Sequence, residues 1–105
     1  RVETFWVLNL NARHGMRGVP QEVTRGILDG SLIHPREVFS AAIRAGSAAV
    51  VVAHNHPSGA AEPSRADELL TQSLKQSLAL VDVKVLDHFL IAGSGVMSFA
   101  ERGLL

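Results

Sequence analysis

A short valine-rich run from Ala48 to Ala53 leads directly into His54-Asn55-His56 and then into the loop residues Pro57-Ser58-Gly59. A continuous apolar run of this length predicts a strand buried on both faces, at the centre of a sheet. Residues two apart on a strand point to the same side, so His54 and His56 can face one point at the strand's end. Pro57 cannot donate to a strand ladder, so pairing should stop there. We therefore expect a fold built around a central strand that ends in two imidazoles.

A helix is predicted to follow from Ser64 to Leu80, because leucines recur at steps of four residues. Asp67 lies in the first turn of this helix, where the positive helix end favours an ionised carboxylate. Two imidazoles and one carboxylate form the ligand set of a catalytic zinc site, in which the fourth position holds water. The spacing therefore predicts that His54, His56 and Asp67 bind zinc.

Structural interpretations compete with this metal site. The histidines could belong to an ordinary polar loop after a strand. Ser64 and Asp67 also have the spacing of a capping box, which stabilises a helix start without any chemistry. Capping and a site-facing Ser64 hydroxyl are compatible, so both alternatives stay open for that residue.

The remaining elements predict a mixed α/β domain, in which a sheet has helices on both sides of the histidine-bearing strand. Pro35 suits the first turn of a helix that Gly46 ends. Trp6 is expected in the core, inside a first strand packed on both faces. The expected extended segments are Glu3 to Leu10, Met16 to Leu28, Val83 to Leu86, Phe89 to Ala92 and Val96 to Phe99.

Composition narrows the class of protein. A chain of 105 residues fits one domain, and the absence of cysteine excludes disulfides and thiolate zinc ligands. The formal net charge of zero speaks against nucleic acid as the main ligand. No apolar run is long enough to cross a bilayer, so we expect no membrane partner and a cytoplasmic location. Because a strand begins almost at once, we expect a domain cut from a longer polypeptide.

The residues at the site resemble the JAMM motif of MPN-domain metalloproteases: a Glu, a variable gap, His-x-His, seven residues, Ser, two residues and Asp. The wider chain resembles the bacterial RadC family over almost its whole length. The similar stretches are Glu3-Thr4-Phe5, Leu8 to Asn11, His34 to Phe39, Ala53 to Gly59, Pro63 to Asp67, Leu86 to His88, Ser98-Phe99 and Glu101 to Gly103.

This resemblance implies an MPN (JAMM) domain of cytidine deaminase-like architecture over residues 1–105, without the N-terminal helix-hairpin-helix region of many RadC proteins. It implies that His54, His56 and Asp67 bind Zn²⁺ and that Ser64 stabilises an oxyanion. A glutamate from an earlier strand would act as the base on water. We assign this role to Glu3, which opens the first long strand, and keep Glu37 and Glu22 as alternatives.

The expected function is a zinc metallohydrolase of the metalloprotease type, which cleaves a peptide or isopeptide amide in a protein or peptide substrate. The alternatives are a RadC module associated with DNA repair, as an accessory factor or nuclease, and a zinc-bound interaction domain without catalysis. The oligomeric state is left open, with a homodimer as one option. For His88, a sheet histidine bonded to Asp87 or the backbone is favoured over a role behind the metal ligands.

Overall fold

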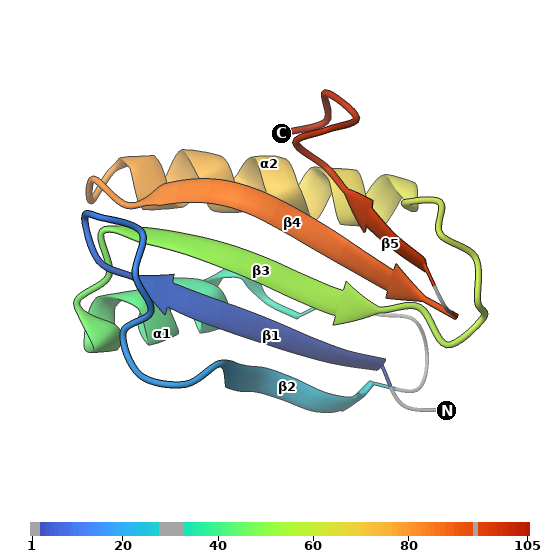
Figure 1. The fold of residues 1–105 in the computed structure, drawn as a ribbon, viewed down its shortest axis with the longest axis horizontal. Coiled ribbons are helices and arrows are strands. Elements are labelled where there is room, and N and C mark those ends of the chain that lie inside the picture. The colour runs from blue at the N-terminus through green and yellow to red at the C-terminus, as the bar shows by residue number, and fades with distance from the viewer. Residues whose placement is uncertain (1–2, 28–32, 94) are drawn as a thin grey trace.

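A computed structural model describes residues 3–27, 33–93 and 95–105 of the chain. Within these ranges a single five-stranded sheet has the strand order β2-β1-β3-β4-β5 (Figure 1). Strands β3 and β4 are parallel, and every other neighbouring pair is antiparallel. The predicted class, an α/β domain with a mixed sheet, is confirmed. The elements in chain order are β1 (Glu3–Leu10), β2 (Gln21–Ile27), α1 (Pro35–Ala45), β3 (Ala49–Asn55), α2 (Arg65–Ala79), β4 (Lys84–Ala92) and β5 (Gly95–Ser98).

Most predicted boundaries are close to the observed ones. Strand β1 has the predicted bounds, whereas β3 runs two residues further than its apolar part, so that His54 and Asn55 still belong to the strand. The two extended segments predicted between Val83 and Ala92 are one strand, β4. Of the segment predicted from Met16, only Gln21–Ile27 forms a strand, and Leu28 lies outside the described residues.

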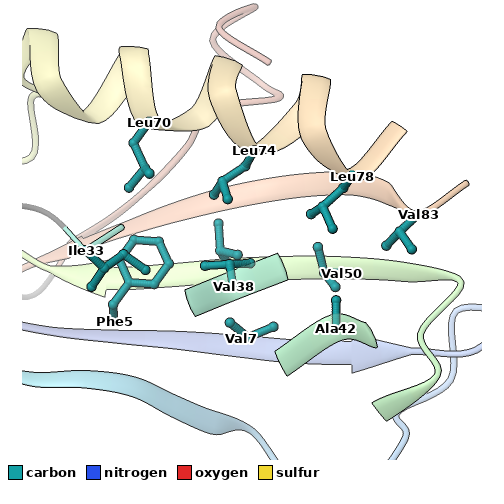
Figure 2. Packing of buried hydrophobic residues seen from close by; sticks show 11 residues of the cluster. Phe5, Val7, Ile33, Val38, Ala42, Val50, Leu70, Leu74, Leu78 and Val83 are labelled. Atoms are coloured by element: carbon teal, nitrogen blue, oxygen red, sulfur yellow. The ribbon is translucent and has the colours of Figure 1, made fainter. Parts of the chain in front are cut away.

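Both helices pack on the same face of the sheet, which corrects the prediction of helices on both sides. The buried side chains of β1 and β3 on this face meet α1 and α2 in one cluster, and the two helices also contact each other. Figure 2 shows Leu70, Leu74 and Leu78 of α2 pointing toward Val38 of α1 and toward the sheet. The parallel β3–α2–β4 crossover requires α2 on this face, and the apolar side of α1 is covered only if it shares that face.

The other face of the sheet is only partly covered. Trp6 is 36% exposed there, and Ile91 is 42% exposed. The prediction that Trp6 belongs to the core is therefore wrong, since alternate residues of β1 face the uncovered side.

Capping residues fix one end of each helix as predicted, the end of α1 and the start of α2. Gly46 ends α1 in the left-handed conformation, with φ of 66°, and its N–H bonds carbonyls of the last turn. Ser64 begins α2 with a complete capping box: its side chain accepts from the Asp67 N–H, and the Asp67 carboxylate accepts from the Ser64 N–H. This start places the first turn of α2 just beyond the end of β3.

Candidate metal centre

The two histidines and the aspartate meet at the carboxyl end of β3. His54 Nε2 lies 3.2 Å from Asp67 Oδ1, and His56 Nε2 lies 3.1 Å from Asp67 Oδ2. A helix that follows a parallel strand begins beside the carboxyl end of that strand, which is why Asp67 returns to the histidines. The structure therefore brings together the three residues whose spacing predicted a shared ion.

Antiparallel pairing of β1 with β3 brings Glu3 to the same place. Phe5 lies opposite His54 in the register, so that the start of β1 reaches past the end of β3. Asn55, which points away from the site, anchors this end: its Oδ1 accepts from the backbone N–H of Thr4 at 2.6 Å and from the Thr4 hydroxyl at 3.1 Å. As a result, Glu3 Oε2 lies 3.7 Å from His54 Nε2.

The two alternative glutamates lie elsewhere. Glu22 is opposite Trp6 in the β1–β2 pair, and Glu37 is exposed in the first turn of α1. Among the described residues, the group that could hold a metal consists of Glu3, His54 and His56, whose ligand atoms lie within 4.8 Å of one another. The structure thus brings one of the three glutamates to the histidines, although its role as a base stays a prediction.

The atoms that face the centre fit a metal ion. His54 Nε2 and Asp67 Oδ1 are buried, and within the described part of the chain neither has a hydrogen-bond partner, because their 3.2 Å separation is not aligned for one. Two ligands that each lie about 2.1 Å from a tetrahedral zinc ion are about 3.4 Å apart, close to the spacings seen here. Imidazole nitrogen and carboxylate oxygen are donors that zinc accepts. An ion between these atoms would satisfy both of them.

Two acids compete for the third ligand position. Asp67 is 1% exposed and contacts both histidines, whereas the Glu3 side chain is 13% exposed and reaches only His54 at 3.7 Å. A buried carboxylate with one unpartnered oxygen suits a ligand, and a carboxylate open to solvent suits an exchange of protons with water.

Electrostatics keep Asp67 ionised. Burial raises the pKa of its carboxyl, but the nearby His54 imidazole and the hydrogen bonds from Ser64 outweigh that effect and hold the pKa well below its ordinary value. The Ser64 N–H donates to Asp67 Oδ2 at 2.7 Å. Asp67 therefore carries the charge that metal binding requires.

Ser64 is exposed at the edge of the site. Its oxygen accepts from the Asp67 N–H at 3.0 Å, so the hydroxyl proton is not used by the cap. The capping interpretation is confirmed, while the oxyanion role stays a prediction.

His88 lies directly behind His54. It is a strand residue bonded to Asp87, as the favoured interpretation expects, but through its backbone N–H and not through its ring. Its Nε2 is 2.8 Å from His54 Nδ1, and its Nδ1 is 2.7 Å from the Thr71 hydroxyl. Burial above all, together with the neighbouring His54, lowers the pKa of His88 to about 3, so the ring is neutral. The ring thus contacts a predicted metal ligand rather than Asp87.

Asp87 hydrogen-bonds to the chain around β5 and not to the His88 ring. Its carboxylate accepts from the backbone N–H of His88 and of Ala100 and from the Ser98 hydroxyl, which holds the chain after β5. Phe99 is thereby stacked on His88, with ring centroids 4.3 Å apart.

Thr71 was missed by the sequence reasoning. It is fully buried between the leucines of the apolar face of α2, and its hydroxyl also bonds the Asp67 carbonyl oxygen at 2.9 Å. A threonine among leucines at helical spacing was a readable signal, because buried hydroxyls need partners.

The fold and this cluster define an α/β domain of the JAB/MPN class with a candidate metal centre. A family model described as RadC-like JAB domain matches residues 1–104. The chain therefore belongs to the RadC-like JAB domain family, and the predicted family is confirmed.

Relatives carry the name UPF0758 protein. One from Nitrosococcus oceani is 54% identical over 103 residues, which are 98% of this chain and 46% of the relative. Those from Methylibium petroleiphilum and Nitrosomonas europaea are 56% and 58% identical with the same coverage. The chain thus spans about half the length of these relatives, 46% in each case. In the part of the chain that is described, neither helix has the length and apolar character needed to span a bilayer.

Proposed function

We propose that this domain is a zinc-dependent hydrolase of peptide or isopeptide amides, with His54, His56 and Asp67 as zinc ligands and Glu3 as the general base. The observation that carries the proposal is the pair of buried, unpartnered atoms His54 Nε2 and Asp67 Oδ1, 3.2 Å apart. Membership of the RadC-like JAB family supports the same class of site.

A bound zinc ion would supply Lewis acidity and would lower the pKa of a water molecule to about 7. The chain's own residues do the rest. Glu3 takes the proton from that water and later passes it to the leaving amine, since its carboxylate lies beside the histidines and is partly open to solvent. The unused hydroxyl proton of Ser64 is donated to the oxyanion of the attacked carbonyl.

Buried surroundings hold these groups in place. Phe5 stacks on the His54 ring with centroids 5.5 Å apart, and the capping box fixes the Asp67 carboxylate. A ligand set held by packing and hydrogen bonds needs little rearrangement when the ion binds.

The test combines metal binding with hydrolysis. The purified chain is titrated with Zn²⁺ in a calorimeter and then incubated with a peptide library, with and without a chelator. We expect one zinc ion per chain and cleavage that disappears with the chelator and in His54→Ala. Cleavage that survives both treatments would contradict the proposal, and so would the absence of zinc binding by the folded chain.

The RadC name leaves a repair-associated role as the alternative, as an accessory factor or nuclease. The net charge of zero offers it no electrostatic support. DNA binding by the chain that weakens steeply with salt, together with zinc binding but no amide cleavage, would favour it. Zinc binding with neither DNA binding nor cleavage would favour a non-catalytic interaction domain.

A further inference from the structure

A buried chain of hydrogen-bonding groups runs from the backbone of α2 to the back of His54. It links the Asp67 carbonyl oxygen, the Thr71 hydroxyl, the His88 ring and His54 Nδ1 at successive distances of 2.9, 2.7 and 2.8 Å. We propose that Thr71 and His88 are positioning residues that hold His54 in the tautomer whose Nε2 lone pair faces the metal centre. The use of that lone pair rests on the proposed zinc site, whereas the tautomer itself does not.

The Asp67 carbonyl oxygen at one end determines which group donates and which accepts in each of these hydrogen bonds. A carbonyl oxygen only accepts, so the single hydroxyl proton of Thr71 goes to Asp67. The Thr71 oxygen then accepts from His88 Nδ1–H. A neutral imidazole carries one N–H, so His88 Nε2 must accept. It accepts from His54 Nδ1–H, which leaves His54 Nε2 without a proton.

The reverse direction is disfavoured at the site end. It would place a proton on the buried His54 Nε2. Among the described residues, Asp67 Oδ1 at 3.2 Å is not aligned to accept that proton, and Glu3 Oε2 at 3.7 Å is too far away for a hydrogen bond. A buried N–H without an acceptor costs free energy, whereas an unprotonated nitrogen that faces an ion position does not. With His54 as donor to His88, and His88 as donor to Thr71, every N–H and O–H in this series of hydrogen bonds has an acceptor.

Packing prevents the rings from escaping this arrangement. His88 has no exposed surface and lies between Phe99, stacked at 4.3 Å, and Phe5, whose ring meets it edge-on at 5.8 Å. A charged imidazolium is disfavoured between two aromatic rings away from water. His88 thus stays neutral and can both donate to Thr71 and accept from His54.

His56 is oriented differently. Its Nδ1 lies 3.1 Å from the Ala60 carbonyl oxygen, and its Nε2 lies 3.1 Å from Asp67 Oδ2. Both oxygens only accept, so they compete for the single proton of a neutral His56 ring, and the proposal concerns the tautomer of His54 alone.

The experiment reads the tautomer directly in the metal-free chain. Histidine ring nitrogens are labelled with ¹⁵N and their shifts are recorded at about pH 8, well above the ordinary histidine pKa of about 6.5. We expect His54 to show a protonated Nδ1 and an unprotonated Nε2, and His88 to show the same pattern. A protonated His54 Nε2, alone or together with a protonated Nδ1, would overturn the proposal.

A matched pair of variants tests whether the hydrogen bonds through Thr71 and His88 orient His54. Thr71→Val keeps the shape but removes the hydroxyl, and Thr71→Ser keeps the hydroxyl. We expect mixed His54 tautomers and a roughly 10-fold weaker zinc affinity in Thr71→Val, with Thr71→Ser within about threefold of wild type. His88→Phe keeps the stacking on Phe99 and should weaken zinc binding by about 10- to 100-fold.

Different results would contradict the positioning role of Thr71 and His88 and the proposed zinc-dependent function. Unchanged His54 shifts and zinc affinity in folded Thr71→Val would overturn the positioning role while leaving the zinc site intact. A wild-type chain that binds no zinc would end the proposed function, and the nitrogen shifts would still decide the tautomer.

Discussion

The buried half of the site and its open half are built in different ways. The buried half, formed by His54, Asp67, Thr71 and His88, has side chains that are at most 1% exposed and is held by a continuous chain of hydrogen bonds. The open half, formed by Glu3, His56 and Ser64, contains side chains such as Glu3 and His56 that are 13% and 16% exposed. A site of this kind can hold an ion rigidly on one side and admit water and substrate on the other.

Because of this difference, we expect substitutions in the two halves to have different effects on folding stability and on catalysis. Groups in the buried half have few alternative partners, so changing them should affect both folding and metal binding. Groups in the open half can be solvated, so changing them should affect binding or rate with little effect on folding.

Replacement of either proposed histidine ligand, His54 or His56, should have the largest effect on zinc binding. His54→Ala and His56→Ala should each weaken zinc binding by more than about 100-fold, beyond the loss caused by changing a ligand's partner. His54→Ala should also destabilise the metal-free chain by about 1–3 kcal/mol, because His88 Nε2 loses its partner in a buried position. Calorimetric titration and urea unfolding measure both quantities. Equal destabilisation by the two variants would break the contrast between the halves.

Replacement of the proposed base should separate rate from binding. Glu3→Gln should lower amide hydrolysis by about 10²- to 10⁴-fold while zinc affinity stays within a few fold. The reason is that the amide keeps the shape of the side chain but cannot take a proton. If zinc affinity falls as far as in His54→Ala, Glu3 is a ligand and the assignment of Asp67 as the third ligand must be revised.

The free energy of unfolding should depend on pH in the way expected for a buried, neutral His88. Its folded pKa of about 3 lies below the ordinary 6.5, so the unfolded chain binds more protons between these values and acidification destabilises the fold. One such group contributes a slope of about 1.4 kcal/mol per pH unit. His88→Gln should lose that slope between about pH 6 and 4.

Urea unfolding of the metal-free chain at several pH values in this window measures the slope. Asp67 contributes equally in the two proteins, because its lowered pKa makes it a source of stability that is lost as the pH falls toward and below its ordinary value of 3.8, with or without His88. Parallel slopes for wild type and His88→Gln would show that His88 takes up protons in the fold, which would contradict its burial as a neutral ring.

The smallest effect is expected at the edge of the open half. Ser64→Ala should cost about 1 kcal/mol in stability through loss of the helix cap. Ser64→Gly is the matched control, since glycine at a helix cap costs only a few tenths of a kcal/mol but has no side-chain donor to offer an oxyanion. A hydrolysis rate that is low in both variants, with stability kept only in Ser64→Gly, would support the oxyanion role. A normal rate in Ser64→Gly would leave Ser64 with its capping role alone.

The sequence by itself determined the local parts of this protein. His54 and His56 share a side because a strand repeats every two residues, and Asp67 sits in the first turn because Ser64 caps it; both are short-range rules of backbone geometry. The central strand, the two helices and the spacing of the proposed ligands were readable for the same reason.

Only the tertiary structure decided which residues from distant parts of the chain lie beside His54, His56 and Asp67. Pairing of β1 with β3 brought Glu3 to a histidine 51 positions away, and the β3–α2–β4 crossover placed Thr71 and His88 behind His54. Strand register and helix packing depend on the burial of the whole sheet face, which also put both helices on one side and left Trp6 on the other. No local pattern encodes those choices, because they follow from contacts between segments that are remote along the chain.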